Sequence, residues 1–93
     1  MILTTVRPRL SPKVRLRFDR RTGRHLLLYP EAGFELNNTA TAIARLCTGE
    51  WMIDEMVDHL TRAYDAVSPN EIRREVCEFL DVLVDRGLLQ VVS

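Results

Sequence analysis

The side chains best suited to catalysis or metal binding are few in this chain of 93 residues. The histidines, His25 and His59, fall in a predicted strand and on the polar side of a predicted helix, so nothing pairs them as metal ligands. The cysteines, Cys47 and Cys77, form no C-x-x-C motif and lie in helical patterns, which favours reduced, buried thiols. The sequence has neither a cysteine triplet for an iron–sulfur cluster nor a glycine-rich phosphate-binding motif. We therefore expect a protein that is not an enzyme and that holds no metal or cofactor.

Charge is distributed unevenly along a chain whose formal net charge is zero. Residues 1–30 hold eight basic groups and one acidic group, a balance of +7. Residues 31–93 hold five basic and twelve acidic groups, a balance of −7. Each charged side chain taken alone is accounted for by exposure to solvent. The separation of basic from acidic residues along the chain, however, predicts a partner that is oriented by electrostatics.

Length and composition predict one domain spanning residues 1–93. A hydrophobic fraction of 46% is that of an ordinary globular protein. No apolar run approaches the roughly 20 residues of a membrane span, and the first ten residues do not form a signal peptide. We expect a cytoplasmic protein.

Three short strands are predicted between residues 13 and 37. Residues 14–19, VRLRFD, alternate between apolar and charged side chains, which is typical of a half-buried strand. Residues 25–29, HLLLY, form an apolar run too short for a helix, which indicates a central strand. Residues 34–37, FELN, alternate again. Turns at Gly23 and at Pro30 to Gly33 would join the three as an antiparallel meander.

Three helices are predicted after the strands, over residues 38–47, 53–64 and 68–87. Asn37 or Asn38 caps the first, and Ser68, with Pro69 and Glu71, forms a capping box for the third. Strands followed by helices that cover one face of a sheet define an α+β fold, here a three-stranded antiparallel meander followed by three α-helices.

The third predicted helix has an unusually wide apolar face. Its core stripe comprises Ile72, Val76, Phe79, Leu80 and Leu83. Cys77 and Val84 fall to one side of this stripe, beside Arg73, and a helix that faces a single core needs a narrower one. Either a neighbouring strand or the C-terminal LLQVV segment covers this flank, or the flank contacts a partner.

The edges of the predicted sheet differ in how open they are. The first strand is protected against pairing with another chain by prolines and charges, namely Pro8, Pro12, Arg15 and Arg17. The third strand carries one charge, Glu35. If the wide flank of the third helix lies beside that open edge, strand and helix form a groove suited to an extended peptide.

A winged-helix protein that binds nucleic acid through the basic N-terminal hairpin is the alternative. The third helix would then be the recognition helix, but its exposed positions are mostly acidic, which opposes entry into a DNA groove. These acidic residues are Glu71, Glu75, Glu78, Asp81 and Asp85.

The sequence resembles the PqqD family over about residues 8–89. The likeness rests on VRLRFD, on LLLYPEAGFELNNTATAIARLCTGE, on IDEMVDHL and on FLDVLVDRGLL. It implies a winged-helix-like RiPP recognition element, a non-catalytic chaperone of pyrroloquinoline quinone (PQQ) biosynthesis. Such a protein binds the ribosomally made precursor peptide PqqA and presents it to the radical-SAM enzyme PqqE.

The resemblance also implies which residues would contact the peptide. In related recognition elements the peptide pairs with the third strand and packs on the third helix. Carried onto this chain, the strand contacts are Phe34, Glu35, Leu36 and Asn37, and the helix contacts are Arg73, Cys77, Leu80 and Val84.

One stretch departs from the family pattern. Relatives usually place a small hydroxyl residue after Gly49-Glu50 to cap the second helix, and here Trp51 and Met52 stand there instead. Trp51 either packs over helix ends or contacts a partner enzyme or a second copy of the chain. We assign Arg15, Arg17 and Trp51 as candidates for docking the partner enzyme. An open third strand also makes a homodimer by strand or hairpin exchange plausible.

Overall fold

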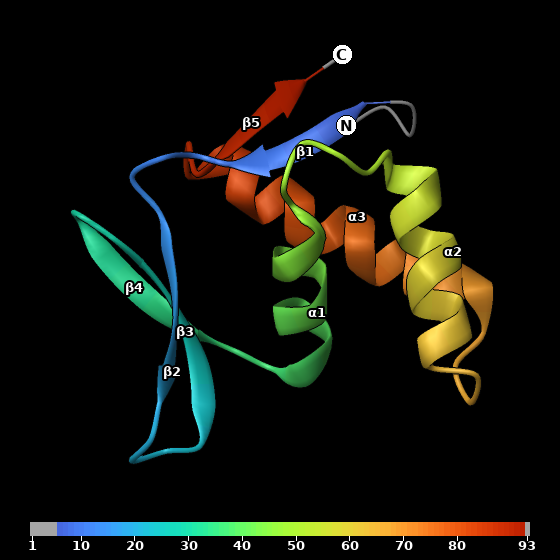
Figure 1. Ribbon diagram of the computed structural model, residues 1–93, viewed down its shortest axis with the longest axis horizontal. Coiled ribbons are helices and arrows are strands. Elements are labelled where there is room, and N and C mark those ends of the chain that lie inside the picture. Colours follow the sequence, from blue (N-terminus) through green and yellow to red (C-terminus); the bar gives the residue numbers. More distant parts are fainter. Residues whose placement is uncertain (1–5, 93) are drawn as a thin grey trace.

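The computed structural model describes residues 6–92; a three-stranded antiparallel sheet lies at one side of the molecule, and the three helices that follow it lie on the other side (Figure 1). The strands are β2 (Arg15–Asp19), β3 (Arg24–Tyr29) and β4 (Ala32–Leu36), in the order β2-β3-β4. The helices are α1 (Asn38–Leu46), α2 (Ile53–Ala63) and α3 (Pro69–Asp85). This arrangement confirms the predicted α+β class.

Two further strands, which the sequence did not predict, form a separate antiparallel pair. They are β1 (Arg7–Leu10) and β5 (Leu89–Val92), with Arg7 opposite Val92 and Leu10 opposite Leu89. Each strand has four residues. Because the two strands lie far apart in the sequence, no local sequence pattern predicts that they pair. The strand limits of 13–37 were therefore too narrow.

Backbone hydrogen bonds fasten β1 to the helical part of the molecule. The amide of Leu10 donates to the carbonyl of Cys47 at 3.1 Å, and the amide of Gly49 donates to the carbonyl of Pro8 at 2.9 Å. The amide of Ser11 donates to the carbonyl of Leu88 at 2.8 Å. Pro8 is fully buried because it lies between β5 and this helical segment.

The core is built from one face of the sheet and the inner faces of all three helices. Leu27 at the centre of β3 has no exposed surface, and the alternation of the strand places its neighbours Leu26 and Leu28 on the opposite, outer face. The buried core side chains are Leu27, Leu36, Ile43, Ala44, Cys47, Ile53, Met56, Val57, Leu60, Ile72, Val76, Leu80, Leu83 and Leu88. The 3.6-residue period of the helices accounts for most of this set.

The helix starts follow the predicted capping chemistry, with one exception. Asn37 Oδ1 accepts from the amide of Ala40 at 2.7 Å, and Ser68 Oγ accepts from the amide of Glu71 at 3.2 Å. The N-cap of α2 is Met52, which offers no side-chain acceptor to the helix. The carboxylate of Glu55 still accepts from the amide of Met52 at 2.8 Å, so half of the usual reciprocal arrangement is present.

Trp51 packs against the core and against α2. The Trp51 and His59 rings meet edge to face, with centroids 5.0 Å apart, and the Trp51 side chain is half-buried. Trp51 therefore lies along α2, against His59. Within residues 6–92, the structure contains no helix with the length and apolar character that a bilayer crossing requires.

Candidate functional site

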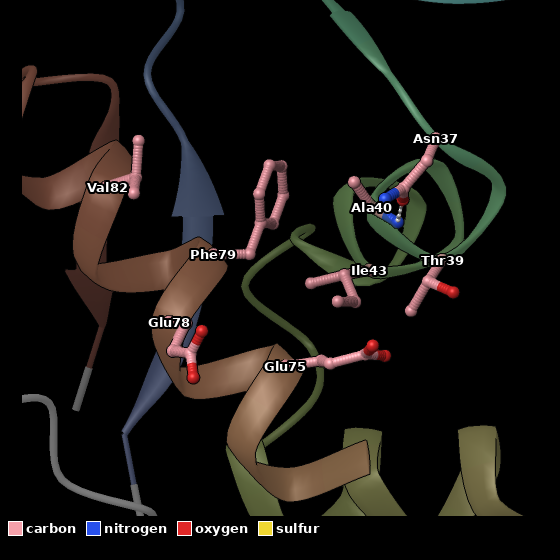
Figure 2. Close-up of a pocket in the computed structure, with 8 residues that line it drawn as sticks. All are labelled: Asn37, Thr39, Ala40, Ile43, Glu75, Glu78, Phe79 and Val82. Atoms are coloured by element: carbon pink, nitrogen blue, oxygen red, sulfur yellow. Dashed lines mark hydrogen bonds between the residues drawn. The ribbon is translucent and has the colours of Figure 1, made fainter. Parts of the chain in front are cut away.

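A groove of about 270 Å³ lies between the first turn of α1 and the middle of α3 (Figure 2). Its lining residues are Asn37, Thr39, Ala40, Ile43, Glu75, Glu78, Phe79 and Val82. Figure 2 shows the Phe79 ring standing between the two helices, with the Glu75 carboxylate directed toward α1. The groove begins where the chain leaves β4, because Asn37 is both the residue after that strand's end and the cap of α1.

The floor of the groove is apolar and its rim is acidic. Ile43 is buried, Phe79 is half-buried, and Val82 keeps 42% of its surface exposed. On the rim, Glu78 lies 3.7 Å from Arg74 in an exposed ion pair, and Glu75 forms no ion pair with any described residue. An apolar floor with polar edges suits a partner that buries some side chains and leaves its backbone near the rim.

The edge of β4, the strand that ends one residue before the groove-lining Asn37, is open. β4 pairs with β3 on one side and has no strand on its other side within residues 6–92. In an antiparallel ladder, the backbone groups of alternate residues point toward each neighbour, so such an edge presents donors and acceptors to an added strand.

Arg86 connects the far end of α3 to the sheet. Its guanidinium lies 5.0 Å from the centroid of the Phe34 ring, and its Nη1 donates to the Tyr29 hydroxyl at 3.2 Å. The rings of Tyr29 and Phe34 are themselves edge to face at 6.4 Å. The side of α3 that faces β3 and β4 is therefore the side that carries Arg86, together with Phe79 and Val82.

This arrangement corrects the predicted position of the helix wall. Val82 and Val84 are two residues apart and so point about 200° apart around the helix. Arg73, which shares the flank of Val84, donates to Asp54 of α2 at 2.8 Å. On that same flank, Cys77 is half-buried and Val84 keeps 44% of its surface exposed. The flank predicted to lie beside β4 therefore lies on the other side of α3.

The prediction that Leu80 lines a groove wall is wrong, because none of the surface of Leu80 is exposed and the residue belongs to the core. The width of the apolar stripe is evident in the sequence, but the side from which the sheet approaches α3 is not. The spacing of Phe79, Val82 and Arg86, at i, i+3 and i+7, was the available signal for the correct flank.

The predicted strand residues take different positions around β4. Asn37 lines the groove and the Phe34 ring lies under Arg86. Leu36 is buried in the core, 3% exposed. Glu35 is exposed and lies 3.7 Å from Arg24 of the neighbouring strand. The side chains of Leu36 and Glu35 therefore do not line the groove.

The candidate docking residues do not form one surface. Arg15 and Arg17 are exposed on β2, opposite Leu28 and Leu26 of β3. Trp51 instead borders a separate hollow along α2, whose lining is Trp51, Glu55, Asp58, His59 and Arg62. Neither set shares a residue with the groove.

Among residues 6–92, neither cysteine forms a hydrogen bond with a histidine or an acidic side chain. Cys47 is 4% exposed, and its thiol donates to the carbonyl of Ile43 at 3.4 Å. Burial raises the pKa of the Cys47 thiol from 9.0 to about 12, because a thiolate would be poorly solvated there. Residues 6–92 contain no group of three or more histidine, cysteine or acidic side chains placed to hold a metal ion.

Sheet, helices and groove together define a small α+β domain with an open strand edge on β4 and an apolar groove between α1 and α3 that begins at Asn37, the residue after that strand. The model of the family described as "Coenzyme PQQ synthesis protein D (PqqD)" matches residues 24–89. The chain belongs to the PqqD family.

Curated relatives agree with this assignment. A "PqqA binding protein" of Methylococcus capsulatus is 38% identical over 81 residues, which cover 87% of this chain and 84% of that protein. A "Bifunctional coenzyme PQQ synthesis protein C/D" of Methylorubrum extorquens is 35% identical over 83 residues, 89% of this chain but 22% of that longer protein.

Solved structures share the fold. The solution structure of the PqqD truncation of Methylobacterium extorquens PqqCD, described as a stand-alone RiPP recognition element, superimposes with a TM-score of 0.77. It is 34% identical, and the match covers 91% of this chain and 88% of that one. TbiB1, solved with the TbiA(β) leader peptide, superimposes with a TM-score of 0.73 at 23% identity. The match covers 88% of this chain and 94% of TbiB1, and it supports the fold alone.

Proposed function

We propose that this protein is a non-catalytic chaperone that binds the precursor peptide PqqA and presents it to the radical-SAM enzyme PqqE. The observation that carries this proposal is the open edge of β4, which leads at Asn37 into an apolar groove between α1 and α3. The names of the relatives point the same way, since the M. capsulatus protein is called a PqqA binding protein.

The peptide would bind by adding a strand to β4. Main-chain hydrogen bonds to the free edge supply affinity that does not depend on sequence, and side chains that enter the groove supply specificity. The side chains expected to receive them are Phe79 and Val82, with Ile43 beneath. This revises the helix contacts from the Arg73, Cys77 and Val84 flank to the opposite one, and it keeps the backbone of residues 34–37 as the pairing strand.

Presentation to the enzyme would rest on proximity rather than on chemistry. A peptide held on this domain has a high effective concentration near any enzyme that the domain also binds, so each separate affinity can be modest. Arg15 and Arg17 remain the proposed docking residues, because they are exposed and lie outside the groove.

Val82 and Val84 provide a matched test of the binding site. They are the same residue type on the same helix, with 42% and 44% of their surface exposed, and they point to opposite flanks. We expect Val82→Asp to weaken PqqA binding at least tenfold, because a carboxylate would be desolvated against the peptide. We expect Val84→Asp to leave affinity within about twofold, since exposed substitutions have small effects.

The affinities would be measured by isothermal titration calorimetry with synthetic PqqA, with circular dichroism to establish that both variants are folded. A loss confined to Val84→Asp would restore the flank predicted from the sequence. No binding of PqqA by the unmodified protein, with binding of a DNA duplex that requires Arg15 and Arg17, would replace the proposal with the nucleic-acid alternative.

A further inference from the structure

Opposite charges lie at the two ends of a surface made by the groove and, beyond its lining residues, by the contact of Arg86 with Phe34 and Tyr29. Glu75 and Glu78 line the end next to Asn37, where β4 passes into α1. Arg86 lies at the other end, over Phe34 and against Tyr29, which pairs with the first residue of β4. Along the chain, Glu75 and Glu78 of α3 therefore precede Arg86, the C-cap of this helix, while β4 runs in the reverse sense, from Ala32 near Arg86 toward Asn37 near the two glutamates.

These charges are left largely unneutralised by the rest of the described chain. Glu75 and Arg86 form no ion pair with any residue between 6 and 92. Glu78 meets Arg74 at 3.7 Å, but their side chains are 71% and 67% exposed, so this pair is weak and easily exchanged. The Arg86 contacts with a phenol and a ring use few of its five N–H donors and leave its positive charge in place.

The distance between the two ends sets a spacing in an extended peptide. Glu78 and Arg86 are eight residues apart on α3, which corresponds to about 12 Å along the helix axis. An extended strand rises roughly 3.4 Å per residue, so about four residues span that distance. An even number also places both side chains on the same face of the strand, the face turned toward α3.

We propose that the groove selects a peptide in which a basic side chain precedes an acidic one by four residues. The inference rests on the proposed function, because it assumes that a peptide pairs with β4. Antiparallel pairing is the slightly more stable arrangement, and it places the N-terminal part of the peptide beside Asn37. The basic side chain then meets Glu75 and Glu78, and the acidic side chain four positions later meets Arg86.

Two synthetic peptides of equal composition test the charge order. Both share one short host sequence of strand-forming residues; one has Lys at position i and Glu at i+4, and the other has Glu at i and Lys at i+4. Net charge and hydrophobicity are identical. We expect the Lys-first peptide to bind about tenfold more tightly at low salt, because two favourable charge pairs replace two unfavourable ones, and the ratio should shrink as salt rises.

Charge reversal in the protein supplies the complementary test. A variant with Glu75→Lys, Glu78→Lys and Arg86→Glu is expected to prefer the Glu-first peptide. Asp81→Lys is the matched control: it also reverses an acid on the exposed surface of α3, but Asp81 does not line the groove, and the original preference should persist. Amide NMR titration measures binding down to millimolar affinities and also reports whether each variant is folded.

The possible outcomes separate this inference from the proposed function. Equal binding of the two peptides, a preference for the Glu-first peptide, or binding of neither would overturn the charge-order inference. PqqA binding that depends on Val82 would still stand in each of those cases. A preference of the unmodified protein for the Lys-first peptide, reversed by the triple variant and unaffected by Asp81→Lys, would support it.

Discussion

Burial decides what Cys47 can do. Its side chain belongs to the core, donates a hydrogen bond to the carbonyl of Ile43, and is separated from water. Cys77 is half-buried on α3 and has access to solvent. The sequence predicted two buried thiols with no catalytic role, and the structure confirms full burial for the first only.

The raised pKa of Cys47 predicts a loss of stability in alkaline solution. Between pH 9 and about 12 the unfolded chain releases the thiol proton and the folded chain keeps it, so rising pH favours unfolding. The stabilising effect is complete below pH 9 and is lost at about 1.4 kcal/mol per pH unit above it. Urea unfolding at pH 8, 9, 10 and 11 measures the slope.

Cys47→Ala is the control for that slope. The variant starts less stable because it leaves a small cavity, but its stability should fall less steeply with pH than that of the unmodified protein. Parallel slopes for the two proteins would show that other groups, such as the tyrosines, cause the alkaline loss.

At the scale of helices and strands, local sequence was a sufficient guide for six elements. The alternation of residues 14–19 and the caps Asn37 and Ser68 act over a few residues, and β2, α1 and α3 begin within about one residue of the predicted positions. β4 starts at Ala32, two residues before the predicted strand, because the turn after Tyr29 is tighter than expected.

What local sequence could not supply is contact between distant segments. β1 and β5 are defined by pairing with each other, and their four-residue stretches carry no pattern of their own. The choice between the two flanks of α3 likewise depends on the approach of β4, which is set by Arg86 contacting Tyr29 and Phe34. Of the residues predicted from the sequence to contact a peptide, Asn37 alone lines the groove, and the flank of α3 that borders the groove was not foreseeable.

The start of α2 predicts a stabilising substitution. Met52 caps this helix without a side-chain acceptor, so a first-turn amide lacks a capping partner. Met52→Ser should supply it and raise the free energy of unfolding by roughly 0.5–1 kcal/mol. Chemical denaturation measures the change. Ser68→Ala removes an observed cap from α3 and should lower the free energy of unfolding by about 1 kcal/mol, measured by the same method. A Met52→Ser protein that is no more stable than its parent would contradict the capping argument.

At the scale of the whole molecule, the β1–β5 pair holds the first and last described segments against the helices. Deleting residues 1–11 would expose the carbonyls of Cys47 and Leu88 and leave β5 without a partner. We expect a loss of at least about 2 kcal/mol in unfolding free energy, measured by urea denaturation. No groove residue lies in β1 or β5, so PqqA affinity at low temperature should change little. An unchanged stability would show that the pair is not part of the cooperative unit.

The same pair has a consequence for how the domain can be joined to other chains. Because Arg7 lies opposite Val92, the chain enters and leaves the fold side by side, at a place that contributes nothing to the groove (Figure 1). A short linker can therefore close the two ends into a circle, with new ends opened at the exposed turn around Gly23. Fusion at either end should likewise leave the groove accessible, as in the M. extorquens protein, where the matching segment is 22% of a longer chain.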